Sequence, residues 1–223
     1  NNSFNLHILN PYFHHKSFDR IILPEHDNFN TLENIIFMKG SLVDIEKLNI
    51  SEDKVRNFKK KINLKKKVIA VLLGGSGRSS VLRKTDLEKP IKFLNSLKCE
   101  YEIVYCFSRR TPEKIKEFIK KEKKDTHHIF ESYENDSYRL LMKYAHSFLI
   151  TEDSISMTSE VISSGKPVYI IKVRKIKKKI SLFQDSIMSL GFTRYLKNEL
   201  DIWSYKPLNE TKRISEIITN LLV

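Results

Sequence analysis

Short apolar runs alternate with segments of helical period along most of the chain. The pattern predicts strands over residues 6–9, 20–24, 34–38, 67–75, 101–108, 126–132, 148–151 and 167–171. Apolar positions three and four apart predict helices over residues 86–98, 111–124, 136–147, 154–165, 176–190 and 209–223. Strands that alternate with helices are typical of an α/β protein with a parallel sheet.

The spacing of these elements divides the chain into two unequal parts. The first three strands follow one another too closely for crossover helices of ordinary length, so residues 1–42 read as the C-terminal part of a truncated N-terminal Rossmann-like domain. Residues 43–65 are polar and basic and are predicted to form a helical linker. Residues 66–223 carry five strand-helix alternations, enough for a complete Rossmann-like domain. The start has neither Met nor a signal-peptide pattern, and we expect it to lie inside a longer chain.

Local signals define several helix ends. Thr111 is predicted to cap a helix whose first residue is Pro112, and Gly165 closes the helix before the last strand. A 4-3-4-3 spacing of Ile176, Ile180, Phe183, Ile187 and Leu190 predicts a one-faced amphipathic helix that ends at Gly191.

The loops after the strands are where a ligand is expected, because such sheets bind ligands outside the carboxyl ends of their strands. The loops after Leu73, Phe107, Ser132 and Ile150 should therefore share one rim. In the first of them, "LLGGSGRSS", glycines allow close approach of the backbone, and free N–H groups attract anions. The candidate phosphate ligands are Gly74, Gly75, Ser76 and Arg78. The sequence matches neither GxGxxG nor a Walker loop, and a tight turn without a ligand remains the alternative.

A second polar stretch, "FSRRTPEK", follows the next strand of the domain. The planar guanidinium of arginine suits phosphate oxygens, and two arginines beside a helix N-terminus can form an anion clamp. We predict ligand contacts from Ser108, Arg109, Arg110 and Thr111. A pair of arginines that does not follow a strand at this rim more often lies on the protein surface and binds no ligand.

A third stretch, "TEDSISMTSE", follows residues 148–151. Asp153 or Ser154 can cap the helix, and Ser156 and Glu160 lie four residues apart on one face, next to Met157. A carboxylate at Glu160 could accept both hydroxyls of a ribose. The alternative is a helix whose polar face merely meets water.

"LPEHDN" holds a His-Asp pair, His26 and Asp27, the candidate catalytic base on this chain. Ligand spacing for a metal is absent around it, so no metal site is predicted. Cys99 and Cys106 have neither metal-type nor redox-type spacing, which fits a reducing cytoplasm.

Charge changes the expected partners. The 223 residues carry a net charge of +13, much of it in lysine runs at 59–67, 120–124 and 174–179. This favours anionic partners such as a phosphorylated ligand or the acidic inner face of a membrane, although lysine runs are usually just solvated. Aromatic residues do not interleave the runs, which argues against nucleic acid. The apolar runs are all shorter than the roughly 20 residues of a membrane span.

Taken together, "LPEHD", "LLGG", "FSRRTPEKI", "TEDSISMTSEVISSGKPVYII" and "FQDSIMSLGFTRYL" resemble the mitochondrial-fission, "elongated mitochondria" family. That family is similar to GT-B glycosyltransferases such as the peptidoglycan N-acetylglucosaminyltransferase. The resemblance implies a GT-B-like α/β fold and a nucleotide-diphosphate sugar as donor substrate, with no other cofactor. It also implies diphosphate at residues 74–78, ribose at Glu160 and base or phosphate near residues 108–111.

Several functions share this resemblance. The first is metal-independent transfer of a sugar to an envelope or lipid-linked acceptor at the cytoplasmic face of the membrane. The second is a non-catalytic, membrane-associated adaptor, as the plant family members are thought to recruit a dynamin-like protein to mitochondria. The third is a nucleotide-sugar 2-epimerase. Nucleic-acid binding ranks last.

Overall fold

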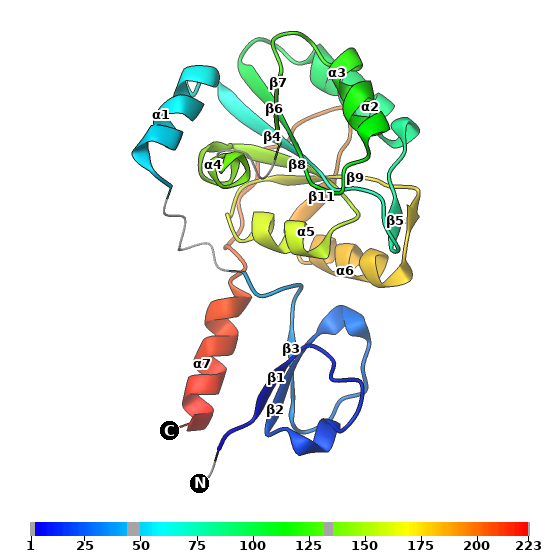
Figure 1. Ribbon diagram of the computed structural model, residues 1–223, viewed down its shortest axis with the longest axis vertical. Helices are drawn as coiled ribbons and strands as arrows, with labels where there is room; N and C mark the ends of the chain where they lie inside the picture. The colour runs from blue at the N-terminus through cyan, green and yellow to red at the C-terminus, as the bar shows by residue number, and fades with distance from the viewer. Residues whose placement is uncertain (1–2, 44–49, 132–135, 223) are drawn as a thin grey trace.

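The computed structural model describes residues 3–43, 50–131 and 136–222. Its N-terminal part is a three-stranded parallel sheet, seen at the bottom of Figure 1. The strands are β1 (Leu6–Ile8), β2 (Arg20–Pro24) and β3 (Ile35–Met38), in that order, with short 3₁₀ turns η1 (His15–Ser17) and η2 (Glu25–Asp27) between them. The connections between these strands are too short for crossover helices, as the sequence indicated.

The larger part is a six-stranded sheet in which every pairing is parallel, with the order β11-β9-β8-β4-β6-β7. Its strands are β4 (Lys67–Leu73), β6 (Tyr101–Phe107), β7 (His128–Glu131), β8 (Ser147–Thr151), β9 (Val168–Ile171) and β11 (Thr193–Tyr195). The helices of the chain are α1 (Glu52–Lys61), α2 (Lys84–Ser96), α3 (Glu113–Glu122), α4 (Ser137–Tyr144), α5 (Ile155–Ile162), α6 (Lys178–Ser189) and α7 (Glu210–Leu222).

Both faces of the large sheet are covered, which explains its continuous apolar runs. Alternate side chains of β4 point to opposite faces, so Ala70 joins one cluster with α1, α4, α5 and α6, while Val71 joins another with α2 and α3. All six residues from Val68 to Leu73 are buried. The centre of the sheet is therefore rigid, and it fixes the loop that follows β4.

Several contacts between described residues join the parts, and two of them involve η2 and α7. In the first, η2 packs against α6. In the second, α7 returns to the N-terminal sheet, where Ile214 packs with Ile22 and Met38, and Glu210 accepts a 2.7 Å hydrogen bond from the Lys39 N–H. The chain thus ends on the sheet with which it began (Figure 1).

The structure corrects some local predictions. Ile176 begins no helix: it lies in β10 (Lys175–Ile176), which pairs antiparallel with β5 (Ser80–Val81), and neither strand was predicted. The edge strand β11 was missed as well. Thr111 does not cap α3, whose N-cap is Pro112. The predicted linker contains α1, and its residues 44–49, like Ser132 of a predicted strand, lie outside the described part of the chain.

None of the helices in the described ranges is both long and apolar enough to cross a membrane.

Candidate functional site

A cavity of about 540 Å³ lies at the carboxyl ends of β4 and β6, beside α4 and α5. The parallel sheet brings the loops after β4, β6 and β8 to this edge, as the sequence predicted. Of the predicted ligand-binding residues, eight line the cavity: Gly74, Ser108, Arg109, Arg110, Ser154, Ser156, Met157 and Glu160. They come from three separate segments of the chain.

The glycines of the first loop are needed for packing within the protein. A Cβ on Gly74 would overlap the carboxylate of Asp153, and one on Gly75 would overlap the backbone carbonyl of Arg110. The Gly74 N–H donates to Oγ1 of Thr151 at 2.8 Å, and the Gly75 N–H donates to Oδ2 of Asp153 at 2.9 Å. These two N–H groups, predicted to be free for phosphate, therefore already have protein acceptors.

Neither Ser76 nor Arg78 lines this cavity. The Ser76 hydroxyl accepts a 3.1 Å hydrogen bond from the Leu82 N–H. Arg78 is exposed near the β5–β10 pair. The loop does not run directly into a helix, because β5 intervenes before α2.

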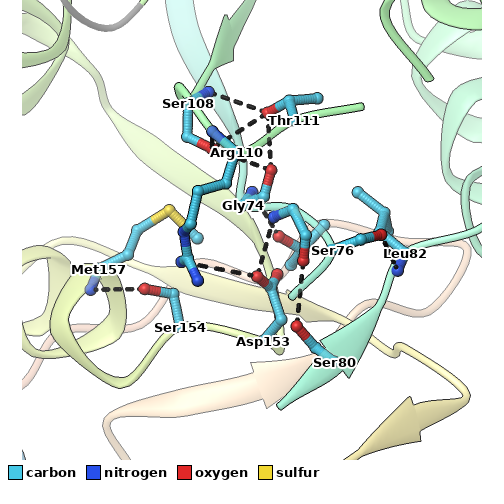
Figure 2. A network of polar contacts seen from close by, with 12 residues as sticks. Gly74, Ser76, Ser80, Leu82, Ser108, Arg110, Thr111, Asp153, Ser154 and Met157 are labelled. Carbon is cyan, nitrogen blue, oxygen red and sulfur yellow. Dashed lines mark hydrogen bonds and ion pairs between the residues drawn. The ribbon is translucent and has the colours of Figure 1, made fainter. Parts of the chain in front are cut away.

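Ser108 and Thr111 tie the second loop to the first. The Thr111 side chain is buried, and its hydroxyl lies 2.6 Å from the carbonyl oxygen of Gly74, to which it donates. The Ser108 hydroxyl can also donate to that carbonyl, at 3.0 Å. Figure 2 shows both side chains directed at Gly74. Thr111 thus positions the loop, while Ser108, Arg109 and Arg110 reach the cavity.

Asp153 is the buried centre of the third loop. Burial raises the pKa of its carboxyl, and hydrogen bonds from Thr151 and the Gly75 N–H, with the nearby Arg110, oppose that shift. An Arg110 guanidinium nitrogen lies 4.0 Å from Oδ2. Asp153 does not line the cavity. Helix capping falls to Ser154, whose hydroxyl accepts the Met157 N–H at 3.3 Å.

Glu160 lies on the cavity side of α5 and already has a partner. The phenol of Tyr138 in α4 donates a short hydrogen bond to Oε2 of Glu160. Burial raises the pKa of the Glu160 carboxyl, and the Tyr138 hydrogen bond opposes the shift. Burial and the adjacent Glu160 raise the pKa of Tyr138, so the phenol stays protonated and remains a donor. A ribose hydroxyl would have to replace this donor.

The sequence reasoning missed six residues that line the cavity: Leu72, Leu73, Cys106, Asp136, Tyr138 and Arg139. The sequence did point to Asp136, Tyr138 and Arg139, because they follow Ser132 and the loop after Ser132 was expected at the same rim. Leu72, Leu73 and Cys106 gave no signal, because they read as ordinary buried strand residues.

His26 and Asp27 lie elsewhere. Asp27 forms an ion pair with Lys179 of α6, and the His26 ring meets Phe183 edge-on at 5.2 Å. His26 lines a separate cavity of about 190 Å³ that shares no residue with the larger one. Burial, followed by the charge of Lys179, lowers the pKa of His26 to about 4. Among the described residues, no group of three or more His, Cys, Asp or Glu could hold a metal ion.

A sequence model of the mitochondrial fission ELM1 family matches residues 1–222. The chain belongs to this family. The chain is 29% identical to mitochondrial fission protein ELM1 of Arabidopsis thaliana over 94% of its own length and 56% of that protein. It is 33% identical to an uncharacterised protein of Rickettsia prowazekii (strain Madrid E) over 69% of its own length and 46% of that protein. This ELM1-family chain thus spans about half the length of these relatives.

Solved structures define the fold of this ELM1-family chain as GT-B-like. UDP-GlcNAc 2-epimerase of Methanocaldococcus jannaschii, solved with UDP-GlcNAc and UDP, superposes with a TM-score of 0.58 at 14% identity, covering 91% of this chain and 61% of the epimerase. The glycosyltransferase of kitacinnamycin superposes with a TM-score of 0.50 at 12% identity, covering 92% and 47%. At these identities the likeness concerns the fold alone.

Proposed function

We propose that the cavity at the carboxyl edge of the large sheet binds a nucleotide-diphosphate sugar, and that the protein transfers the sugar to an envelope or lipid-linked acceptor. The observation that carries the proposal is the convergence of a partly buried carboxylate and two arginines, from different segments, on one cavity of about 540 Å³. The volume is of the size usual for small-ligand sites. The solved relatives of the same fold include proteins crystallised with UDP-sugars.

Each group has a role that follows from its chemistry. The Glu160 carboxylate accepts hydrogen bonds from the ribose hydroxyls, and Tyr138 gives up its own hydrogen bond to Glu160. Arg109 and Arg110 are exposed beside the cavity and neutralise the diphosphate. Ile155 and Ser156 begin α5, where backbone N–H groups have no acceptor within the helix, and Ser156 lines the cavity. Stabilisation of the leaving diphosphate by these fixed charges and dipoles would be the main catalytic contribution.

His26 and Asp27 are not used as catalytic groups in this proposal. Asp27 is engaged by Lys179, and with a pKa of about 4 His26 is a weak base at neutral pH. In this proposal the general base for the acceptor comes from the N-terminal part of the protein, where the described residues form the sheet β1-β2-β3.

The test is a thermal-shift screen of the full chain against UDP-, GDP- and CMP-sugars, followed by calorimetry on any ligand that raises the melting temperature. Glu160→Gln should weaken binding at least about tenfold, because charge-assisted hydrogen bonds to the ribose are lost. The matched control is Glu113→Gln, which should leave binding unchanged. The Glu113 side chain is 66% exposed and lines none of the described cavities. No shift with any nucleotide sugar would contradict the proposal and favour the adaptor function.

A 2-epimerase is the second candidate. The UDP-GlcNAc 2-epimerase of M. jannaschii superposes with a TM-score of 0.58, against 0.50 for the glycosyltransferase of kitacinnamycin. Incubation with the binding nucleotide sugar alone separates the two reactions. A 2-epimeric sugar formed without an acceptor would identify an epimerase, whereas a transferase requires the acceptor before its donor is consumed.

A further inference from the structure

The β5–β10 pair brings two basic segments of the chain together. Residues 76–84 contain three Lys or Arg, residues 172–179 contain six, and neither segment contains Asp or Glu. They are far apart in sequence, but Lys175 pairs with Val81, and the Lys177 N–H donates to the Ser79 carbonyl at 2.8 Å. We call these two segments the basic ribbon. Figure 1 shows β5 at the side of the large domain, next to α6.

Most of these charges are not neutralised inside the protein. Nε of Arg174 lies 3.6 Å from Oδ1 of Asp86, and the Lys179 ammonium forms an ion pair with the Asp27 carboxylate. The other seven have no carboxylate within 4 Å among the described residues: Arg78, Arg83, Lys84, Lys172, Lys175, Lys177 and Lys178. All seven are exposed. Exposed, unpaired charge of one sign creates a field that attracts a polyanionic surface.

Apolar groups adjoin the basic ribbon. Leu182 is 43% exposed and lies one helical turn after Lys178, on the same face of α6. A recess of about 380 Å³ opens beside the ribbon; Lys172 and Arg174 line it together with Phe93, Tyr195 and other residues. Cations beside an exposed apolar side chain such as Leu182 match the boundary between lipid headgroups and acyl chains.

We propose that the basic ribbon, with Leu182, docks the protein on a membrane surface rich in acidic phospholipids. Neither segment of the ribbon contains Phe, Tyr or Trp, with which proteins stack the bases of single-stranded nucleic acids, and the adjoining Tyr195 ring is only partly exposed, with the Lys172 ammonium over it. The ribbon leads into α6, which packs on the N-terminal unit, so docking would hold the junction between the two units close to the membrane. This inference concerns a surface outside the nucleotide cavity and does not depend on the proposed function.

The test is co-sedimentation of the full chain with vesicles of phosphatidylcholine mixed with phosphatidylglycerol, and with vesicles of phosphatidylcholine alone. The chain should bind the acidic vesicles only, and binding should weaken as salt is raised. Replacing Lys172, Lys175, Lys177 and Lys178 by Ser should weaken binding at least about tenfold, because each basic residue near an acidic surface adds to the attraction. Leu182→Ser should also weaken it, without any change of charge.

The matched control replaces Lys120, Lys121, Lys123 and Lys124 by Ser, which removes the same four charges from another lysine run. It should reduce binding by less than about threefold. Equal losses in the two four-site variants, or equal binding of the unmodified chain to both kinds of vesicle, would overturn the proposal. So would tighter binding to single-stranded RNA than to acidic vesicles. Circular dichroism checks that each variant folds.

The same variants separate this inference from the proposed function. None of the four substituted lysines of the ribbon lines the nucleotide cavity. A thermal shift by a nucleotide sugar should therefore be the same in the ribbon variant and in the unmodified chain. Vesicle binding without any nucleotide shift would overturn the proposed function and leave the docking surface standing.

Discussion

The backbone N–H of Gly75 donates a 2.9 Å hydrogen bond to Oδ2 of Asp153, which joins the loop after β4 to the loop after β8. The carboxylate is buried, and the adjacent Gly74 leaves it just enough space, because any side chain at that position would overlap it. Two loops that are far apart in the sequence are thus locked into one wall of the site. The glycines that suggested a phosphate loop serve first to let this carboxylate approach the backbone.

This packing predicts different outcomes for two glycines of the same loop. Gly74→Ala should lower the free energy of unfolding by about 1–3 kcal/mol, because the added methyl group displaces Asp153. Gly77→Ala should change it by less than about 0.5 kcal/mol, since nothing lies within 4 Å of a Cβ there. Urea denaturation of the two variants measures both values. Similar effects at the two positions would contradict this role of Gly74.

The hydrogen bond from the Tyr138 hydroxyl to Glu160 should compete with the ribose hydroxyls of a bound nucleotide sugar. Tyr138→Phe removes the donor that a ribose must displace from Glu160, and so should tighten nucleotide-sugar binding by about fivefold. It should also lower stability by about 1 kcal/mol without ligand, because a Glu160 oxygen loses its partner. Calorimetry and urea denaturation measure the two effects. Tyr144→Phe is the control, because the Tyr144 hydroxyl makes no hydrogen bond to another described residue. An unchanged Kd in Tyr138→Phe would show that Glu160 does not change partners.

His26 predicts a loss of stability in acid. Its pKa is lowered from 6.5 to about 4 in the folded protein, mainly by burial and then by Lys179, so the unfolded chain binds the proton more readily. Its contribution is therefore complete above pH 6.5 and is lost as the pH falls toward about 4, with a total on the order of 3 kcal/mol. His26→Phe keeps a ring against Phe183 and removes the titration. Urea denaturation across this range should show a smaller acid loss in the variant, and identical slopes would refute the assignment.

Lys166 predicts a change of stability at alkaline pH. Burial lowers its pKa from 10.5 to about 8, while its ammonium donates 2.9 Å hydrogen bonds to the carbonyl oxygens of Met142 and Lys143 at the end of α4. The unfolded chain holds the proton at higher pH, so this residue's contribution to stability should rise from about pH 8 toward 10.5. Lys166→Met should lack that rise in thermal denaturation. A rise that persists in the variant would have to come from other groups.

The predicted class of fold and most strands are confirmed because they depend on local patterns. β2 begins and ends as predicted, and the parallel sheet follows from strands that alternate with helices. The short strands β5 and β10 were not predicted, since two residues each, among lysines and serines, give no periodic signal; their pairing holds them in place. Ile176 was assigned to a helix because its spacing fits either period.

The candidate site was predicted only in outline. Parallel topology placed residues 74, 108 and 154 on one rim, and all three line the cavity. The sequence could not show that Thr111 turns inward to the Gly74 carbonyl, or that Tyr138 reaches Glu160 from another helix. Those contacts depend on the angle between elements, which no local pattern encodes.

By itself, the sequence determined the α/β class, the positions of most strands along the chain, the family and the rim on which polar residues gather, because periodicity and motif spacing are local properties of the chain. Only the tertiary structure decided which groups at that rim remain available. It engaged the N–H groups of Gly74 and Gly75, left Arg109 and Arg110 exposed at the cavity with Arg110 beside Asp153, and placed His26 against another helix. The physical reason is that each buried polar group must find a partner, and those partners come from distant segments that only the folded sheet brings together.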